Sequence, residues 1–281
     1  ALIIWSHHRL LTRLLMELTP DQLERYNRHI ILDNVGVEGQ KRLLDSKVLV
    51  IGCGGLGSPV IMYLAAAGVG TIGVIDGDVV DSSNLQRQII HTTANIGIPK
   101  VISAKQTIKE LNPDTNVVPI EDIATIENIA YIIADYDFVI DATDNFPAKF
   151  LINDACVLAG KAYSHGGILR FEGQTTTITP GNACYRCIYE EPPAKDDIPT
   201  CQEVGVLGAI PGVIGALQAT ECLKYILGDG ELLENRLMVY DALKVRFRDI
   251  KVNKNPDCPL CGENPRITSM ASYTPEFCAL K

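Results

Sequence analysis

The chain has 281 residues and a mean hydropathy of +0.12, which is long and apolar enough to bury a sizeable core and indicates a globular protein. Its 34 acidic and 25 basic residues give a net charge of −9, which argues against a protein that binds nucleic acid by general electrostatics. No apolar run reaches the roughly 18 residues of a membrane-spanning helix, so no membrane partner is expected.

Residues 1–17 are expected to form an N-terminal extension. The alternative is an amphipathic docking helix that would use Leu10, Leu11, Leu14 and Leu15. Thr19, Pro20 and Gln22 have the spacing of an N-cap, a first helical position and a capping box. A helix is therefore predicted to begin there and to continue across Leu23–Leu44.

Apolar strands then alternate with helical stretches. The predicted strands are Lys47–Ile51, Thr71–Ile75, Asn116–Ile120, Phe138–Asp141 and Ala162–His165, and the helices between them include Val101–Leu111 and Ile126–Ala134. This order predicts an α/β fold with a Rossmann-like, mostly parallel sheet and helices on both faces. Ligands in such sheets bind at the carboxyl ends of the strands, which are here Gly52, Asp76 and Asp141–Asp144.

The pattern changes after Gly166. LRFEGQTTTITP alternates like an antiparallel strand, and RLMVYDA with KVRFRDIKV predicts a hairpin, so the sheet is expected to continue as a mixed sheet. The acidic, proline-bearing stretch Glu190–Thr200 predicts a mobile loop, and the apolar stretch Ile214–Leu227 predicts a buried helix.

The stretch VLVIGCGGLGSPVIMYLAAAGVGTIGVIDGD, Val48–Asp78, has the pattern of a phosphate-binding βαβ unit. A β-branched run ends at Gly52, a glycine-rich turn leads into an Ala-rich helix, and a second apolar strand stops at Asp76. Glycines let the backbone approach a phosphate at the helix N-terminus, and Asp76 is placed to hold ribose hydroxyls. These features suit NAD and ATP equally, so this pattern leaves the nucleotide open.

Two cations follow this unit. Arg87 lies in SSNLQRQ, Ser82–Gln88, and Lys100 comes further along the chain. Both are expected at the same sheet edge as the glycine loop, which exceeds what a dinucleotide needs and favours a triphosphate. Taken separately, each cation is also explained as one half of a surface ion pair.

Carboxylates end the predicted strand in DFVIDATDN, Asp137–Asn145. Mg²⁺ prefers one or two carboxylates together with substrate oxygens, so Asp141 or Asp144 is placed to hold Mg²⁺ against phosphates. Taken alone, the same aspartates are equally explained as caps of the helix that begins at Phe146.

Nine cysteines in an α/β pattern without a secretory signal indicate reduced thiols and a cytoplasmic protein. Cys184 and Cys187 in CYRC, and Cys258 and Cys261 in CPLC, are two knuckles separated by 70 residues. Four thiolates leave no open position on Zn²⁺, so the spacing predicts a structural zinc site. Redox-active CxxC pairs remain the alternative, because the separation exceeds that of a usual zinc ribbon.

Cys201 follows the acidic loop in PTCQEVGV. A cysteine on such a loop is accessible, but neighbouring acids would raise its pKa, so nothing local marks it as activated. Cys53, Cys156 and Cys222 lie in apolar runs and are expected in the core.

The chain contains, in order, RYNRHIIL, GCGGLGSP, DGDVVDSSNLQRQ, IGIPK, DATDN, CYRC, TCQEVGV and CPLC. In this the sequence resembles the MoeB/ThiF family, bacterial relatives of ubiquitin-activating enzymes, over about Leu18–Gly262. The resemblance implies an adenylyltransferase that uses ATP and Mg²⁺ to activate the C-terminal Gly-Gly of a small ubiquitin-like sulfur-carrier protein as an acyl-adenylate, with release of pyrophosphate. It also implies a homodimer, a structural Zn²⁺ and sulfur incorporation in molybdopterin or thiamine biosynthesis.

The resemblance assigns roles residue by residue. It implies that Arg87 and Lys100 contact phosphates, that Asp144 stands near Mg²⁺, that Arg28 reaches ATP from the other subunit, and that Cys201 takes part in sulfur or thioester chemistry in some members. The nucleotide-binding positions that it implies are Gly52, Gly54, Gly55, Gly57, Asp76, Asp78, Ser83, Asn84, Gln86, Arg87, Lys100, Asp144 and Asn145. Lys149 departs from the pattern, because many members have Arg there and Lys would replace a bidentate contact by a point charge.

On this basis residues 18–262 are expected to form a single adenylyltransferase domain, followed by a C-terminal tail at 263–281. Its nucleotide-binding half would span about 46–165, and its carrier-binding and zinc half about 166–262. A separate persulfide donor protein is expected as a further partner. The alternatives are a relative that adenylates a nucleoside carboxylate in tRNA, an NAD-dependent oxidoreductase, and a catalytically silent carrier-binding scaffold.

Overall fold

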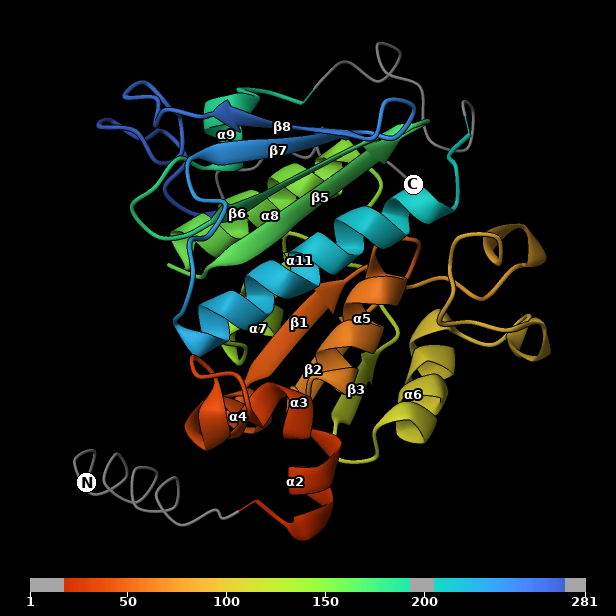
Figure 1. The fold of residues 1–281 in the computed structure, drawn as a ribbon. Helices are drawn as coiled ribbons and strands as arrows, with labels where there is room; N and C mark the ends of the chain where they lie inside the picture. The colour runs from red at the N-terminus through yellow and green to blue at the C-terminus, as the bar shows by residue number, and fades with distance from the viewer. Residues whose placement is uncertain (1–17, 193–204, 271–281) are drawn as a thin grey trace.

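Eight strands form one sheet within residues 18–192 and 205–270, the part of the chain that this computed structural model describes. Their order is β3-β2-β1-β4-β5-β6-β7-β8 (Figure 1). The strands are β1 Lys47–Ile51, β2 Thr71–Ile75, β3 Asn116–Ile120, β4 Phe138–Asp141, β5 Tyr163–Leu169, β6 Glu172–Ile178, β7 Arg236–Asp241 and β8 Arg246–Lys251. The α/β fold with a mixed sheet is thus confirmed.

The first five strands are parallel. β1 pairs with β2 on one side and with β4 on the other, and β3 and β5 extend the sheet at its two sides. The predicted strands at β1 to β4 are confirmed at their full length, and except in the edge strand β3, which is partly exposed, their β-branched runs are buried on both faces. Continuous apolar runs of this kind are typical of parallel strands covered by helices.

The sheet becomes antiparallel at β5. Its first residues pair in parallel with β4, while its whole length pairs antiparallel with β6, and β7 and β8 follow as a hairpin. The prediction of a parallel sheet that continues into a mixed one is confirmed in this geometry. β5 is therefore the strand that joins the two halves of the molecule.

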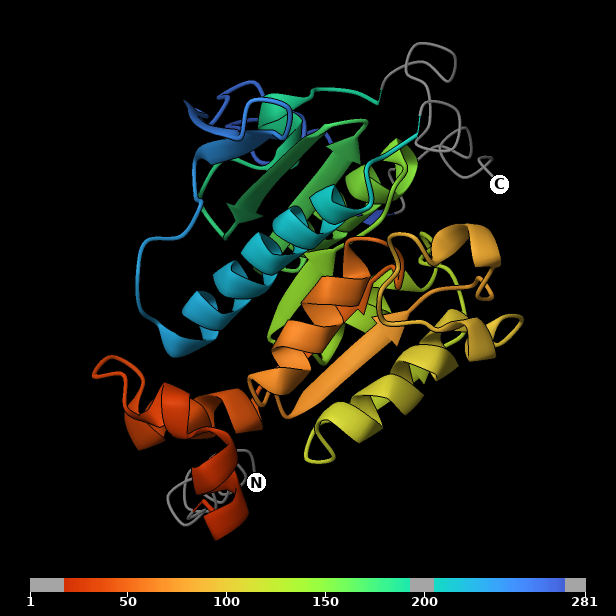
Figure 2. The same cartoon turned by 45° about the vertical axis from the view of Figure 1, so that its right-hand side comes forward.

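Helices cover both faces (Figures 1 and 2). α5 Gly57–Ala66, α6 Lys100–Leu111 and α11 Ala209–Leu227 pack on one core, and α7 Ile129–Ala134 with α8 Phe146–Leu158 packs on the other. Cys53 and Cys222 lie in the first core and Cys156 in the second, as predicted. The change of face occurs between β1 and β4, because α5 follows β1 and α8 follows β4.

The prediction of one opening helix is wrong. Three helices, α2 Pro20–Arg25, α3 Asn27–Ile30 and α4 Gly36–Asp45, replace it. Gly36 has a φ of +58°, which no continuous right-handed helix permits, and it starts α4 in a new direction. The start itself is confirmed, since Thr19 caps α2 and forms a capping box with Gln22.

Residues 1–17, the stretch 193–204 and residues 271–281 lie outside the described residues, so the predicted extension, most of the acidic loop, Cys201 and most of the tail are not addressed. The remaining short helices are α9 Tyr185–Ile188, η1 Ser82–Asn84 and η2 Thr93–Asn95. Among the described helices, none combines the length and the apolar character that a membrane crossing requires.

Candidate active site

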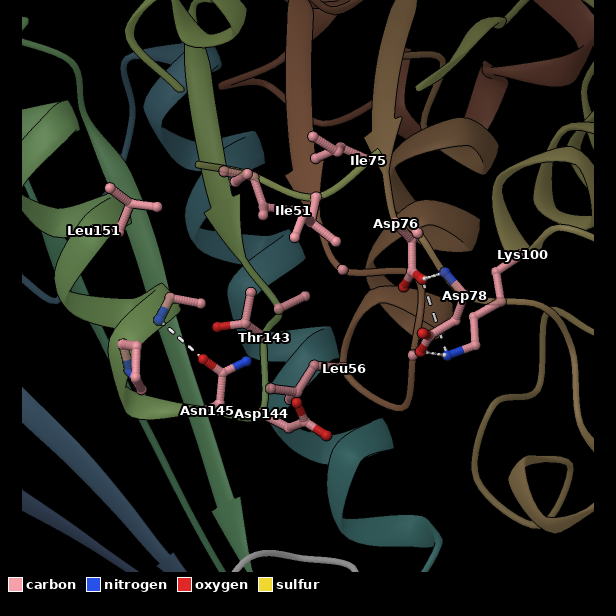
Figure 3. A pocket seen from close by; sticks show the side chains of 18 of the residues that line it. Ile51, Leu56, Ile75, Asp76, Asp78, Lys100, Thr143, Asp144, Asn145 and Leu151 are labelled. Carbon is pink, nitrogen blue, oxygen red and sulfur yellow. Dashed lines mark hydrogen bonds and ion pairs between the residues drawn. The ribbon is translucent and has the colours of Figure 1, made fainter. Parts of the chain in front are cut away.

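A cleft of about 570 Å³ lies at the carboxyl ends of β1, β2 and β4. This is where the connecting helices change from one face of the sheet to the other, the place at which doubly wound sheets bind ligands. Figure 3 shows Asp76, Asp78 and Lys100 on one side of it and Thr143, Asp144 and Asn145 on the other. The size is that of a small-molecule site.

The glycine loop forms the floor of the cleft, and its glycines differ in purpose. Gly52, Gly54 and Gly55 line the cleft, whereas Gly57 does not. Gly52 has a φ of +101°, and a Cβ on Gly57 would lie 2.0 Å from the Gly52 carbonyl oxygen. Gly57 therefore allows close packing of α5 on the loop, while Gly54 and Gly55 leave space for a ligand.

Asp76 holds this loop in place. Its Oδ2 accepts a hydrogen bond from the backbone N–H of Cys53 at 2.7 Å, and its Oδ1 accepts one from that of Asp78 at 2.9 Å. Lys100 is 6% exposed, and its Nζ lies 2.7 Å from the Asp78 carboxylate and 4.0 Å from that of Asp76. Asp76, the predicted ribose contact, and Lys100, a predicted phosphate contact, are thus linked to each other and to Asp78, and Asp76 also holds the glycine loop.

Arg87 lines the cleft beside the glycine loop. Its Nη1 donates a hydrogen bond to the carbonyl of Ser83 at 3.1 Å, and no carboxylate of the described residues is recorded as its ion-pair partner. The adjacent Gln88 was not anticipated from the sequence. Its side chain is 4% exposed beside Gly54, and its Oε1 has no hydrogen-bond partner among the described residues, so it offers an acceptor to a bound molecule.

The two aspartates of DATDN have different surroundings. Asp144 is exposed at the cleft, and no hydrogen bond or ion pair with a described residue is recorded for its carboxylate. Asp141 is fully buried and takes no part in lining the cleft, so the interpretation of Asp141 as a magnesium ligand is wrong. The helix-cap interpretation is wrong as well, because Asn145 caps α8 by accepting a hydrogen bond from the N–H of Ala148 at 2.9 Å.

Asp141 instead belongs to a buried charged cluster. Lys149 Nζ lies 3.2 Å from Asp141 Oδ2, and His165 Nδ1 lies 2.8 Å from the same oxygen. Burial raises the pKa of Asp141, but the Lys149 ammonium and the hydrogen bond from His165 outweigh this and lower it to about 2. Burial lowers the pKa of His165, so its ring is neutral. Lys149 does not line the cleft, and its expected role as a point-charge contact in place of Arg has no support here.

The side of the cleft beyond β3 combines apolar residues with the polar residues Asp122, Thr125 and Glu127. The segment 122–127 contributes Ile123, Ala124 and Ile126, which stand with Ile75 and Leu151 around the same space. This wall was missed in the sequence, although it follows the carboxyl end of a predicted strand and the strand-end rule could have found it. A flat apolar ring system, such as a purine, suits a wall of this kind.

Besides Gly57, four predicted nucleotide-binding or catalytic residues of the described chain do not line the cleft. Ser83, Asn84 and Gln86 belong to the turn that carries Arg87, and the backbone of Gln86 packs against Gly208 at the start of α11. Arg28 is exposed on α3 and does not line the cleft of its own chain.

The four cysteines of the two knuckles come together. The Sγ atoms of Cys184, Cys187, Cys258 and Cys261 all lie within 4.8 Å of one another, and no other group of three or more His, Cys, Asp or Glu side chains with this geometry occurs in the described residues. Cys184 and Cys258 are 3.7 Å apart and Cys187 and Cys261 are 3.4 Å apart. A tetrahedral Zn²⁺ with Zn–S bonds of about 2.3 Å requires sulfur separations of about 3.8 Å.

The chemistry of this cluster also suits a metal. Hydrogen bonds among the four thiols lower the pKa of Cys187 and Cys258 and raise that of Cys184 and Cys261, so the cluster shares its protons. The backbone N–H of Asn255 donates to Cys187 Sγ and that of Cys261 to Cys258 Sγ. All four cysteines are free of disulfides, and each knuckle pairs with the other rather than closing on itself. This arrangement fits zinc better than two separate redox pairs.

The molecule thus combines a doubly wound α/β sheet, a polar cleft at its switch point and a separate four-thiol cluster. The chain belongs to the ThiF family, whose model matches residues 26–260. The predicted resemblance to the MoeB/ThiF family is therefore confirmed.

Named relatives agree with this family. The chain is 49% identical to the "SAMP-activating enzyme E1" of Haloferax volcanii, over 88% of this chain and 92% of that protein. It is 44% identical to the "Sulfur carrier protein adenylyltransferase" of Thermus thermophilus, over 95% of this chain and the whole of that protein. Among solved structures, E. coli MccB in complex with MccA-N7isoASN superposes with a TM-score of 0.76 at 24% identity, over 85% of this chain and 75% of that one, which shows a shared fold.

These names confirm the predicted class of enzyme, an adenylyltransferase. The NAD-dependent oxidoreductase, which rested on the glycine loop and Asp76 alone, has no counterpart in the family or in these two relatives.

Proposed function

We propose that this protein uses ATP to adenylate the C-terminal glycine of a ubiquitin-like sulfur-carrier protein, with release of pyrophosphate. The relatives named as a sulfur-carrier adenylyltransferase and as a SAMP-activating E1 support the substrate class. The observation that carries the proposal is the grouping of Arg87, Lys100 and the exposed carboxylate of Asp144 around one glycine loop.

The reaction is an in-line attack of the carrier's terminal carboxylate on the α-phosphorus of ATP. No general base is required, because this carboxylate is ionised at neutral pH. The protein acts by positioning the two reactants and by neutralising charge. In this proposal Arg87 and Lys100 contact the phosphates, and Gly54 and Gly55 let the backbone approach them.

The nucleoside end fits the opposite part of the cleft. Asp76, at the end of β2, is the proposed ribose partner, and the apolar wall of Ile123, Ala124 and Ile126 is the proposed adenine site. The remaining predicted nucleotide contacts, Gly52, Asp78 and Asn145, also line the cleft. Ser83, Asn84, Gln86 and Gly57 act, in this proposal, by shaping the turn and the loop.

The charge of the cleft supports Mg²⁺ and a further cation. Five carboxylates line it, from Asp76, Asp78, Asp122, Glu127 and Asp144, against the two cations of Arg87 and Lys100. ATP adds about four negative charges, so its binding requires additional positive charge. Asp144 is the residue that would hold Mg²⁺, which supplies charge neutralisation at the phosphates when it is bound. Arg28 of a second subunit would supply the other cation.

A homodimer accounts for the position of Arg28. α3 lies beside a second, smaller hollow of about 210 Å³, lined by His29 and by residues of α5 and α11 such as Tyr63 and Leu223. Ile31, Leu32 and Tyr63 are more than half exposed there. We expect this apolar face to meet a second copy, which would bring Arg28 to the partner's cleft. Mixing Arg28→Ala with Asp144→Asn chains should restore part of the activity that each variant lacks, because mixed dimers contain one intact site.

The second half of the sheet is the proposed carrier-binding half. β8 is an edge strand exposed along its whole length, and Leu243, Val245 and Phe247 are exposed at the β7–β8 hairpin. Cys201 is proposed to serve sulfur transfer rather than adenylation, with a separate protein as the persulfide donor. The thiol cluster is proposed to hold a structural Zn²⁺ that fixes this half, and its reduced cysteines suit the cytoplasm.

The test is ATP–pyrophosphate exchange with Mg²⁺, with and without candidate carriers that end in Gly-Gly. We expect exchange with one carrier only, and none with the same carrier lacking its last glycine. That result would also name the pathway, whether molybdopterin, thiamine or another thiolation. Absence of exchange with every carrier, from protein that holds zinc and binds ATP, would contradict the proposal and favour the tRNA-modifying or scaffold alternative.

A further inference from the structure

The buried cluster of Asp141, Lys149 and His165 lies directly beneath the strand end that carries Asp144. It joins four elements, because Asp141 ends β4, Lys149 belongs to α8, His165 belongs to β5, and Gln218 of α11 donates to the Asp141 carbonyl at 2.8 Å. All four side chains are less than a tenth exposed. The adenylation chemistry described above uses none of them.

Thr143 is held by this cluster at three of its atoms. Its backbone N–H and its hydroxyl donate to Asp141 Oδ1 at 3.0 and 2.6 Å, and its carbonyl accepts a hydrogen bond from Lys149 Nζ at 2.8 Å. Lys149 Nζ also donates to the carbonyl of Gly166 at 2.6 Å. The backbone immediately before Asp144 is therefore fixed to β4, β5 and α8 together.

The backbone immediately after Asp144 is fixed as well. Asn145 caps α8 through the N–H of Ala148, so the helix start cannot move without losing its cap. Asp144 thus lies between two anchored residues, while its own carboxylate is exposed at the cleft (Figure 3). The position of that carboxylate depends on Thr143 and Asn145 rather than on contacts of its own.

Stability alone does not explain a buried lysine and aspartate here. Removing two charges from water carries a large penalty, and a well-packed apolar pair of similar volume is often equally stable. What an apolar pair could not do is hold the amide, the hydroxyl and the carbonyl of Thr143 at once. The donor and acceptor set of Asp141 and Lys149 matches those three groups.

We propose that Lys149 and Asp141 are positioning residues for the adenylation reaction, which fix Thr143 so that the Asp144 carboxylate stands where the Mg²⁺ of the bound nucleotide is held. This inference rests on the proposed function of Asp144. Supporting groups of this kind typically change metal affinity or activity by about 10- to 100-fold when they are replaced. The expected effect is therefore on the Mg²⁺ requirement and not on the glycine loop.

The test is the double variant Asp141→Asn/Lys149→Met, which removes both charges together. Calorimetric titration of ATP is performed at increasing Mg²⁺ and in EDTA, alongside pyrophosphate exchange. We expect the Mg²⁺ concentration for half-maximal effect to rise about 10- to 100-fold. Binding of ATP in EDTA should stay at the wild-type value, because Arg87, Lys100 and the glycine loop are unchanged.

A matched control exists on α11. Glu221 is 3% exposed, pairs with Lys224, and accepts hydrogen bonds from Thr177 Oγ1 at 2.7 Å and from the N–H of Leu233 at 2.6 Å, with no contact to the cleft. Glu221→Gln/Lys224→Met therefore removes another ion pair with a buried carboxylate, whose lysine is partly exposed. It should lower stability and leave the Mg²⁺ dependence at the wild-type value. An equal shift in this control, or an unshifted Mg²⁺ dependence in a folded Asp141→Asn/Lys149→Met protein, would overturn the proposal.

If the double variant does not fold, Thr143 decides. Thr143→Val removes the hydroxyl donor to Asp141, and Thr143→Ser keeps it. The proposal expects a raised Mg²⁺ requirement for Val and a normal one for Ser, and equal behaviour of the two would overturn it. Pyrophosphate exchange by the wild type tests the proposed function. The Mg²⁺ dependence of ATP binding tests the positioning role, and it can be measured even where no carrier supports exchange.

Discussion

The two ends of α8 carry two buried ion pairs of similar chemistry. At the end near the cleft, Lys149 of α8 pairs with Asp141 of β4 at 3.2 Å. Toward the other end, Asp154 of α8 pairs with Arg186 at 2.8 Å. In the sequence Arg186 lies between Cys184 and Cys187 of the thiol cluster. Both carboxylates are inaccessible to solvent.

The bonds around each pair differ. Lys149 donates to two backbone carbonyls and so organises the chain beside the cleft. Arg186 gives its Nε and Nη2 to Asp154, its Nη1 to the carbonyl of Glu190, and lies 4.8 Å above the ring of Phe150. One pair therefore holds the backbone beside the cleft, and the other ties a cysteine knuckle to a helix. In our proposal, similar buried pairs on one helix serve catalysis at one end and stability at the other.

The two ends also meet through Tyr185, the residue before Arg186. Its ring lies 4.6 Å from His165 and 5.1 Å from Phe150, and its backbone N–H donates to Asn153 of α8 at 2.9 Å. The two ends of α8 are therefore in physical contact, and variants at each end can test whether one end affects the Mg²⁺ dependence and the other the stability.

Removal of the metal should have the largest effect. We expect about one Zn²⁺ per chain, and structural zinc contributes on the order of 10 kcal/mol in isolated zinc-binding peptides. Chelation, or Cys258→Ser, should therefore release the zinc and unfold the region around α9 and the β7–β8 hairpin. Zinc analysis together with hydrogen exchange measures both.

In the same experiment β1 to β4 should retain slow exchange when Mg²⁺ is supplied in excess of the chelator, because the knuckle cysteines pack in the core on the α7 and α8 face, whereas the core under α5, α6 and α11 contains none of them. Equal loss of protection over the whole sheet would break the comparison, since the metal end would then stabilise the cleft as well. Protein without bound zinc that kept its full stability would contradict the structural site.

Arg186→Met should have the next largest effect. It leaves the Asp154 carboxylate buried without its guanidinium partner, which typically destabilises a protein by about 3–5 kcal/mol. Asp154→Asn/Arg186→Met should lose less, because both charges are gone. Urea unfolding measures the difference, and a raised Mg²⁺ requirement in the folded protein would show that the metal end also controls the cleft.

Arg87→Ala tests the cleft end by itself. Loss of a cation that meets developing charge lowers rates by about 10²- to 10³-fold, so exchange should be almost abolished while the melting temperature stays unchanged. Arg42→Ala is the control, because Arg42 is an exposed arginine on α4 that lines no part of the cleft. Normal exchange by Arg87→Ala would refute the assigned role.

Much of the fold follows from local patterns. The strands β1, β2 and β4 were predictable because both faces of each run are buried and glycine or aspartate ends or follows it. The edge strand β3 is partly exposed, and its run Asn116–Ile120 was also predicted at its full length. The break of the opening helix at Gly36 was not predicted, because a single glycine is also tolerated inside helices and its positive φ cannot be read from the sequence. The start of α11 was also misplaced, since the helix begins at Ala209, five residues before the predicted start at Ile214.

The candidate site was predictable where chemistry follows a strand end, as at Gly52, Asp76 and Asp144. The network of Asp141, Lys149 and His165 was not predictable, since it depends on side chains from three separate elements. Gln88 was missed because its position beside Gly54 depends on the folded turn, whereas the segment 122–127 follows the end of β3 and the strand-end rule could have found it. A sequence shows which residues end a strand, but not which buried partners hold those ends in place.

The Asp141–Lys149 pair should make the free energy of unfolding depend on pH in the acid range. The pKa of Asp141 is lowered from 3.8 to about 2 in the folded protein, so the stability that it contributes is fully present above 3.8 and is lost as the pH falls toward about 2. Since a shift of one unit corresponds to about 1.4 kcal/mol, this contribution is about 2 kcal/mol. Urea unfolding at a series of pH values should give a shallower acid slope for Asp141→Asn than for the wild type. Identical slopes would mean that the Lys149 ammonium does not hold Asp141 in its charged form, and the distinction between the two ends of α8 would then rest on the thiol cluster alone.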